Sequence, residues 1–220
     1  IDMASMFGSA ISFNQDIISW NVSQVTDMSS MFSGASSFNQ DISSWNVSQV
    51  LDMDSMFRST SSFNQDIGAW EVSGVTDMSN MFHSTSVFNQ DIGLWNVGSV
   101  TKMVRMFHSA SSFNQNIGSW NVASVTDTSS MFNTAVFNQN IGSWNVTSLT
   151  DMSGMFYASS FNQDIGLWDV SSVSDMAYLF HQAYSFNQDI GSWDVRSVTD
   201  MRYMFSQANS FDKEIDSWNV

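Results

Sequence analysis

Residues 27–51 read DMSSMFSGASSFNQDISSWNVSQVL, and the rest of the chain is built from variants of this 25-residue stretch. The 18 Phe fall in two registers and the 16 Met in two more. All nine Trp fall in one register, at steps of 24 or 25 residues: Trp20, Trp45, Trp70, Trp95, Trp120, Trp144, Trp168, Trp193 and Trp218. A fixed period of about 20 to 50 residues indicates a stack of repeats in which each unit buries its neighbour's apolar face.

The first half of the unit has the spacing of a short helix. In DMxxMFxxA, apolar residues recur at i, i+3, i+4 and i+7, which is one face of an α-helix. Asp27 precedes this pattern and is placed as its N-cap. The same interpretation applies to the equivalent residues Asp2, Asp52, Asp77, Asp127, Asp151, Asp175 and Asp200.

The second half of the unit has the pattern of extended chain. FNQDI places three polar residues between Phe38 and Ile42, which favours a short strand with both apolar side chains facing the core. The fold predicted for residues 1–220 is therefore a single leucine-rich-repeat-like α/β solenoid. It has about nine stacked 25-residue coils, each with a short strand and a short helix, and we expect it to be a segment of a longer protein.

Composition excludes several classes of function. Six Lys and Arg stand against 21 Asp and Glu, a net charge of -15, which argues against a nucleic-acid partner. The absence of Cys excludes disulfide scaffolds and thiol catalysis. No apolar run approaches the roughly 20 residues of a membrane helix, so we expect no membrane insertion within this segment.

The strings FNQDI, WNV and MF resemble the 25-residue repeats of the BspA-like surface-protein family, which are related to leucine-rich repeats and occur in mycoplasma-type surface lipoproteins. The resemblance covers the whole chain. It implies a cell-surface or extracellular protein used for adhesion, without a shared catalytic activity. The chain departs from the pattern at Lys102 and in its last unit, at residues 211–215.

Two hypotheses concern the polar residues of FNQD. The first is a repetitive ligand-binding face, for which we select Asn39, Gln40, Asp41, Asn64, Gln65, Asp66, Asn89, Gln90 and Asp91. The second is a calcium ladder, because Ca²⁺ takes several carboxylate oxygens; its candidates are Asp16, Asp41, Asp66, Asp91, Asp164 and Asp189. The alternatives are an amide ladder with a structural role and Asp side chains bonded to the backbone in turns.

Other polar residues have simpler interpretations. We expect the Trp to be core residues rather than a sugar platform. His83 and His108 would be neighbours on adjacent coils but lack a third metal ligand, and Arg196, Arg202 and Tyr203 are expected to form a small patch. N-glycosylation patterns begin at Asn21, Asn46 and Asn145.

The expected function is a non-enzymatic scaffold that binds a protein or a glycan on another cell or in the matrix, since every polar feature is repeated and no unique catalytic group exists. End-to-end self-association into a filament or sheath, with calcium as a possible aid, is the alternative. Ice binding through the Thr series is a further one. No other cofactor is expected.

Overall fold

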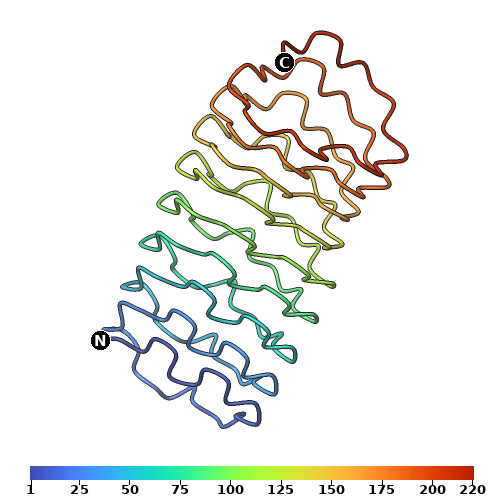
Figure 1. Ribbon diagram of the computed structural model, residues 1–220. Coiled ribbons are helices and arrows are strands. Elements are labelled where there is room, and N and C mark those ends of the chain that lie inside the picture. Colours follow the sequence, from blue (N-terminus) through green and yellow to red (C-terminus); the bar gives the residue numbers. More distant parts are fainter.

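The computed structural model describes all of residues 1–220, as a regular stack of coils (Figure 1). Eight isolated parallel bridges connect nine equivalent residues: Asp2, Asp27, Asp52, Asp77, Lys102, Asp127, Asp151, Asp175 and Asp200. Turns and irregular chain make up the rest, with no α-helix and no strand longer than these single bridges. The predicted stacking of nine units is present, but the predicted leucine-rich-repeat-like α/β solenoid is wrong.

The residues expected to form a helix, Asp27–Ala35, instead form a series of overlapping tight turns, which we call the turn segment. The N–H groups of residues 28, 30, 32 and 34 donate to carbonyls 52, 54, 56 and 58 of the next coil, at 2.7–3.1 Å. Those of residues 31, 33 and 35 donate three residues back within the coil. An isolated two-turn helix leaves its first four N–H groups unbonded. Because the turn segment satisfies every N–H from Met28 to Ala35, it replaces the helix.

Left-handed backbone makes this path possible. Ser30 (φ 56°) and Gly34 (φ 73°) occupy the left-handed region, and each is the third residue of a turn closed by an i+3 to i hydrogen bond. This is the geometry of a type II turn. Every coil repeats both positions, usually with a residue other than Gly. The conformation costs such a residue about 1–2 kcal/mol, which the hydrogen bonds between coils offset.

The expected strand is absent too, although its apolar ends are placed as predicted. Phe38 and Ile42 are fully buried. No backbone bridge joins FNQDI to the preceding coil, because the Asn39 N–H donates to the side-chain Oδ1 of Asn14, at 2.9 Å. An amide side chain therefore takes the place of a sheet hydrogen bond along this side of the stack.

Columns of parallel rings form the core. Within one coil, the rings of Phe32 and Phe38 stack at 4.0 Å between centroids. Along the stack, Phe32 lies 5.8 Å from Phe57, and Trp120 lies 6.5 Å from Trp144 with the two ring planes 2° apart. The columns advance by similar distances, so no helix spreads one side of the stack as the solenoid prediction required. The prediction that the Trp residues belong to the core is confirmed for Trp45 through Trp193, which are 3–4% exposed.

Each Trp from the second coil onward also fixes the position of the coil before it. The Trp120 Nε1–H donates to the carbonyl of Ile92 at 3.1 Å, and the same bond recurs in every coil from Trp45 to Trp218. Because a buried indole N–H requires a partner, the Trp column couples packing to the register between coils.

Candidate functional site

An amide ladder runs along one edge of the stack. The Oδ1 of Asn39 accepts the backbone N–H of Asn64 and the Nε2–H of Gln65, both at 2.9 Å, and the same Nε2 donates to the Asn39 carbonyl. Asn64 receives the equivalent bonds from Asn89 and Gln90, at 3.0 Å. The structural alternative for the Asn-Gln pairs is therefore confirmed, and it orients the Asn Nδ2 and Gln Oε1 atoms away from these bonds.

The Asp residues that follow Gln make local turns. The Oδ1 of Asp41 accepts the N–H of Ser43 at 2.9 Å, and the side chain is exposed. Hydrogen bonds from the Ser43 hydroxyl and then from its backbone N–H hold the pKa of Asp41 below its ordinary value. The same turn occurs at the other calcium candidates, Asp16, Asp66, Asp91, Asp164 and Asp189. We call the Asn, Gln and Asp of the FNQD strings the Asn–Gln–Asp edge.

The structure contains no preformed calcium site along this edge. No three Asp, Glu or His side chains of the structure lie together as a group that could hold a metal ion. Each candidate carboxylate keeps one oxygen, Oδ2, beyond its turn. Calcium at this edge therefore stays a prediction.

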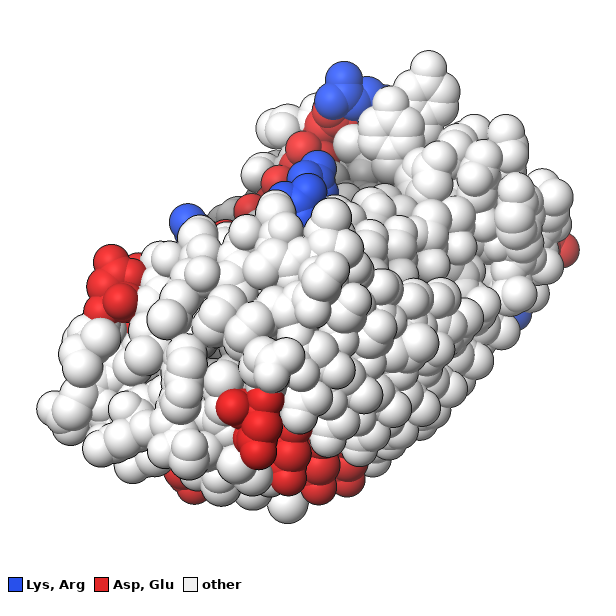
Figure 2. All heavy atoms as spheres, turned by 90° about the horizontal axis from the view of Figure 1, so that it is seen from below, with Lys and Arg blue, Asp and Glu red and all other residues white.

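A second row of carboxylates begins the turn segments, and its members were expected to cap helices. The Oδ1 of Asp27 instead accepts the N–H of Ser29 at 2.8 Å, which closes a turn where no helix follows. Within this row, the side chain of Asp52 is partly buried. Burial raises the pKa of Asp52, and the carboxylates of Asp77 and Asp27 raise it further. Lys102 interrupts the row and lies 4.0 Å from Asp77. Figure 2 shows the acidic side chains gathered in rows on the surface.

Asp52→Asn is expected to stabilise the chain at pH 7, because Asn keeps the Oδ1 acceptor and removes the crowded charge. We expect about 0.5 kcal/mol, or 1–2 °C in Tm. The raised pKa means that the penalty exists above the folded-state pKa and disappears as Asp52 becomes protonated, so the gain should shrink toward about pH 3. Asp41→Asn is the matched control, because its lowered pKa predicts no gain. A thermal melt in which both variants behave alike would contradict this account.

Two histidine rings lie next to each other on the outer side of adjacent turn segments, with their planes tilted by 40°. His83 and His108 lie 4.6 Å apart between ring centroids, and each is half-buried. The pKa of His83 is lowered to about 4, first by burial and then by the charges of His108, Arg58 and Arg105. Burial and Arg105 also lower the pKa of His108. The pair is therefore neutral at pH 7.

This pair predicts a loss of stability in mild acid. Between pH 6.5 and about 4 the unfolded chain binds protons that the folded chain excludes, so stability falls as pH falls through this range. After solvent screening we expect about 1 kcal/mol from His83. His83→Asn introduces the residue found at the equivalent position 133. The Tm of this variant should fall less between pH 7 and pH 5 than the Tm of the parent does. Ser33→Asn, an equivalent change that keeps both histidines, should retain the parent's pH dependence.

Besides the turn segment and the Asn–Gln–Asp edge, each coil has a further corner, where the WNV string lies. The Oδ1 of Asn46 accepts the N–H of Ser48 at 3.1 Å, and Asn21 and Asn145 make the same turn. All three side chains are exposed, and their glycosylation stays a prediction.

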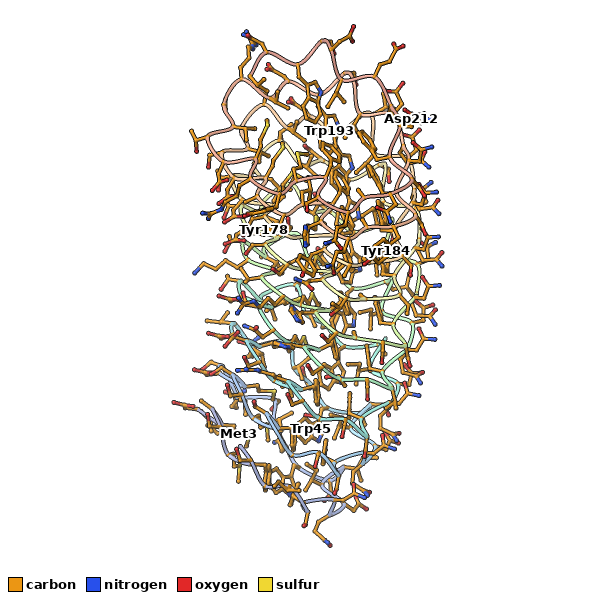
Figure 3. The ribbon with its side chains drawn as sticks, turned by 45° about the vertical axis from the view of Figure 1, so that its right-hand side comes forward. Met3, Trp45, Tyr178, Tyr184, Trp193 and Asp212 are labelled. Carbon is orange, nitrogen blue, oxygen red and sulfur yellow. The ribbon has the colours of Figure 1, made fainter.

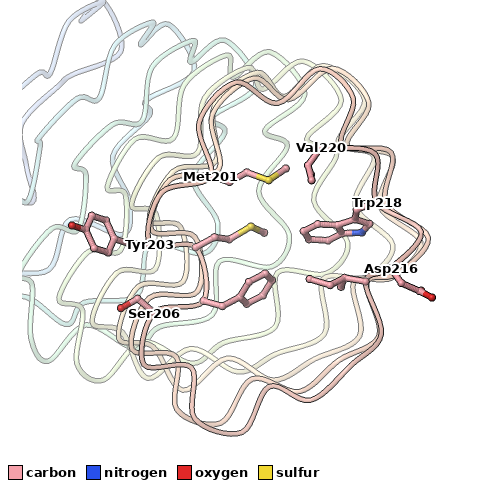
Figure 4. A pocket seen from close by; sticks show the side chains of 9 residues that line it. Met201, Tyr203, Ser206, Asp216, Trp218 and Val220 are labelled. Carbon is pink, nitrogen blue, oxygen red and sulfur yellow. The ribbon is translucent and has the colours of Figure 1, made fainter.

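The largest hollow, about 500 Å³, lies against the ninth coil (Figure 4). Met201, Met204, Phe205, Ile215 and Trp218 line it. These are core positions, which the following coil covers at each equivalent place within the stack. The hollow is thus the uncovered side of the core rather than a ligand site.

The family of the chain can now be stated. Residues 1–75, 66–159 and 133–220 match the family described as "Mycoplasma protein of unknown function, DUF285". The chain belongs to this family. The predicted mycoplasma-type repeat family is therefore confirmed over the whole chain, whereas its BspA-like subdivision is a finer statement than the match makes. Comparison with curated proteins and with solved structures gives no significant match.

An aromatic cluster on this DUF285 chain was missed by sequence reasoning. Tyr157, Tyr178, His181 and Tyr203 lie together on the turn segments of the last coils. Arg202, expected in a patch with Tyr203, lies 6.0 Å from the Tyr178 ring centroid, while Arg196 pairs with Asp194. The available signal was that three of the four Tyr fall in two columns of the repeat, separated by 24 or 25 residues from an aromatic neighbour.

The structure contains no helix that could span a membrane.

Proposed function

We propose that this chain is a non-enzymatic, surface or extracellular adhesion scaffold that binds protein or glycan along its Asn–Gln–Asp edge. One observation carries the proposal: the amide ladder repeats the same Asn and Gln hydrogen bonds, and so the same side-chain orientation, in successive coils from Asn14 to Gln115. A partner with its own repeated groups would make many weak contacts whose affinities combine. The finer placement among BspA-like surface proteins belongs to this proposal, and membership of a mycoplasma repeat family supports it.

The orientation of the amides reduces the entropic cost of binding. The Oδ1 of Asn39 and the Nε2 of Gln65 are held by bonds between coils, so the side chains are already ordered before a partner arrives. Ordering a long side chain at an interface otherwise costs about 0.5–1.5 kcal/mol. The Ser43 hydrogen bonds that lower the pKa of Asp41 also hold its charged carboxylate in place beside the amides. The edge is therefore a rigid row of amides with a row of carboxylates beside it.

A binding screen with an edge variant tests this function. The parent is first screened against immobilised glycans and matrix proteins, with calcium and then with chelator. The edge variant combines Asn39→Asp, Asn64→Asp and Asn89→Asp, which keeps each Oδ1 acceptor and replaces the outward Nδ2; Asp212 already occupies this position in the last coil. We expect at least about a tenfold loss of affinity for the partner found in the screen.

The control variant makes the same charge change at another corner, with Asn46→Asp, Asn96→Asp and Asn121→Asp. Asp169 and Asp194 are natural at that position. This control should bind within about twofold of the parent. Equal losses in the two triple variants would refute binding through the edge. Light scattering in the same two buffers separates adhesion from a calcium-dependent filament, which would assemble only without chelator.

A further inference from the structure

One cluster of side chains on the surface is not repeated along the stack. On the outer side of the turn segments, Tyr178 stacks on Tyr203 with 5.1 Å between centroids, and Tyr157 lies 4.8 Å from His181. Tyr203 is 59% exposed and points away from the core (Figure 4). Figure 3 shows Tyr178 and Tyr184 on different sides of the stack, so the fourth Tyr is not part of this group.

The backbone at this cluster is unfavourable for the residues that occupy it. Tyr178 and Tyr203 have φ of 58° and 56°. The equivalent positions of other coils hold mostly Ser, for example Ser30, and otherwise one Asn, one Gly and one other long side chain, Arg105. A bulky residue in the left-handed region is an outlier, and such outliers concentrate at ligand-binding sites. Because Ser satisfies the fold at this position, folding does not explain the rings.

A hollow of about 290 Å³ lies beside the rings. Its walls include Tyr157 and Tyr178, the amide of Asn133 and the hydroxyls of Ser130 and Ser153. Its floor is Gly154. A Cβ added there would lie 3.2 Å from the Ser130 Oγ, 3.9 Å from the Asn133 Nδ2 and 3.9 Å from the Tyr157 Cβ. The hollow therefore exists because this coil has Gly where its neighbours have a side chain.

The chemistry of the lining specifies the ligand class. The walls contain no charged group; they combine two aromatic faces with one amide and two hydroxyls. Aromatic faces pack against the C–H face of a sugar ring, and amide and hydroxyl groups supply both donors and acceptors for sugar hydroxyls. The volume is at the small end of ligand pockets, which suits a single ring. An anionic ligand would find no cation in the lining.

We propose that the hollow between Tyr157 and Tyr178 binds one neutral hexopyranose residue of a glycan. The ring stacks on Tyr178, and its hydroxyls bond to Asn133, Ser130 and Ser153. The hollow opens outward, so the remainder of a glycan chain extends into solvent. This site lies on the turn segments rather than on the Asn–Gln–Asp edge, and the two proposals can fail independently.

Titration with methyl glycosides tests the site. Saturation-transfer NMR of the full chain uses methyl glucoside, galactoside and mannoside, each neutral. We expect saturable millimolar binding of at least one of them. Tyr178→Ser and Gly154→Asn should each weaken it by at least about tenfold. Both variants introduce residues already present at the same left-handed position, Ser30 and Asn80, so the fold is retained.

Matched controls make the result specific. Tyr184→Ser removes an exposed Tyr outside the cluster. Ser30→Asn introduces Asn at the position equivalent to Gly154, in a coil distant from the hollow. Both should bind within about twofold of the parent. The triple edge variant of the previous subsection should also bind the glycoside normally, which separates this site from the proposed adhesion edge. Absence of saturable binding to all three glycosides, or normal binding by Tyr178→Ser, would overturn the proposal.

Discussion

Trp120→Ala is expected to lower the Tm of the chain by about 10 °C or more. Trp120 is 3% exposed and packs between Trp95 and Trp144, 6.5 Å from each, and against Phe107. Truncation of a buried Trp costs about 3–5 kcal/mol. It also removes the N–H that bonds the Ile92 carbonyl, which adds about 1–3 kcal/mol if that carbonyl stays buried. At about 2–4 °C per kcal/mol for a chain of this size, the sum gives the expected shift.

Two companion variants separate packing from hydrogen bonding. Trp120→Phe keeps an aromatic ring in the column and loses the N–H, so its shift should be intermediate. Trp218→Ala makes the same truncation in the ninth coil, where the ring is only part-buried and stacks on one Trp. Its shift should be about half as large. A Trp120→Ala melt no lower than that of Trp218→Ala would show that the column is not continuous.

The core was predictable from the sequence because ring columns depend only on period. Phe32, Phe38 and Trp45 recur at fixed steps, and any stack that keeps the step buries them. The helix was not predictable by the same argument, since apolar residues at i, i+3, i+4 and i+7 also line the inner side of successive type II turns. The deciding signal was the residues between them. Ser30 and Gly34 are poor helix formers and tolerate turns.

The candidate site was predictable in part for a related reason. An Asn-Gln pair at every period indicates either a binding face or a ladder, and the pattern of letters is the same for both. The structure shows that Oδ1 of Asn39 and Nε2 of Gln65 serve the ladder, which leaves the opposite atoms of the same amides for a partner. The spacing of the Tyr residues was a signal for their cluster, but only the φ of Tyr178 shows that this ring occupies a backbone conformation unfavourable for a bulky side chain.

Deletion of one whole coil, residues 78–102, is expected to leave a folded chain with a single cooperative transition. It joins Asp77 to Met103 in register, so Phe57 meets Phe107 as it now meets Phe82, at 5.8 Å. In a stack with nearest-neighbour coupling, loss of one internal unit removes one unit and one interface and keeps the rest. The denaturant m-value should fall by about one ninth, in proportion to the surface buried.

Deletion of half a coil, residues 78–89, should have a much larger effect although it removes fewer residues. Ser55, Phe57 and Ser59 donate N–H groups to carbonyls 79, 81 and 83, all of which are lost. Each Phe column also loses a ring, at a cost of about 3–5 kcal/mol per ring. The coils before and after the deletion would then be joined through the Trp side alone. We expect two separate transitions by calorimetry, and protection of amide hydrogens that differs between residues 1–77 and 103–220. A single transition at the Tm of the whole-coil deletion would mean that the turn segments contribute little to the coupling between coils.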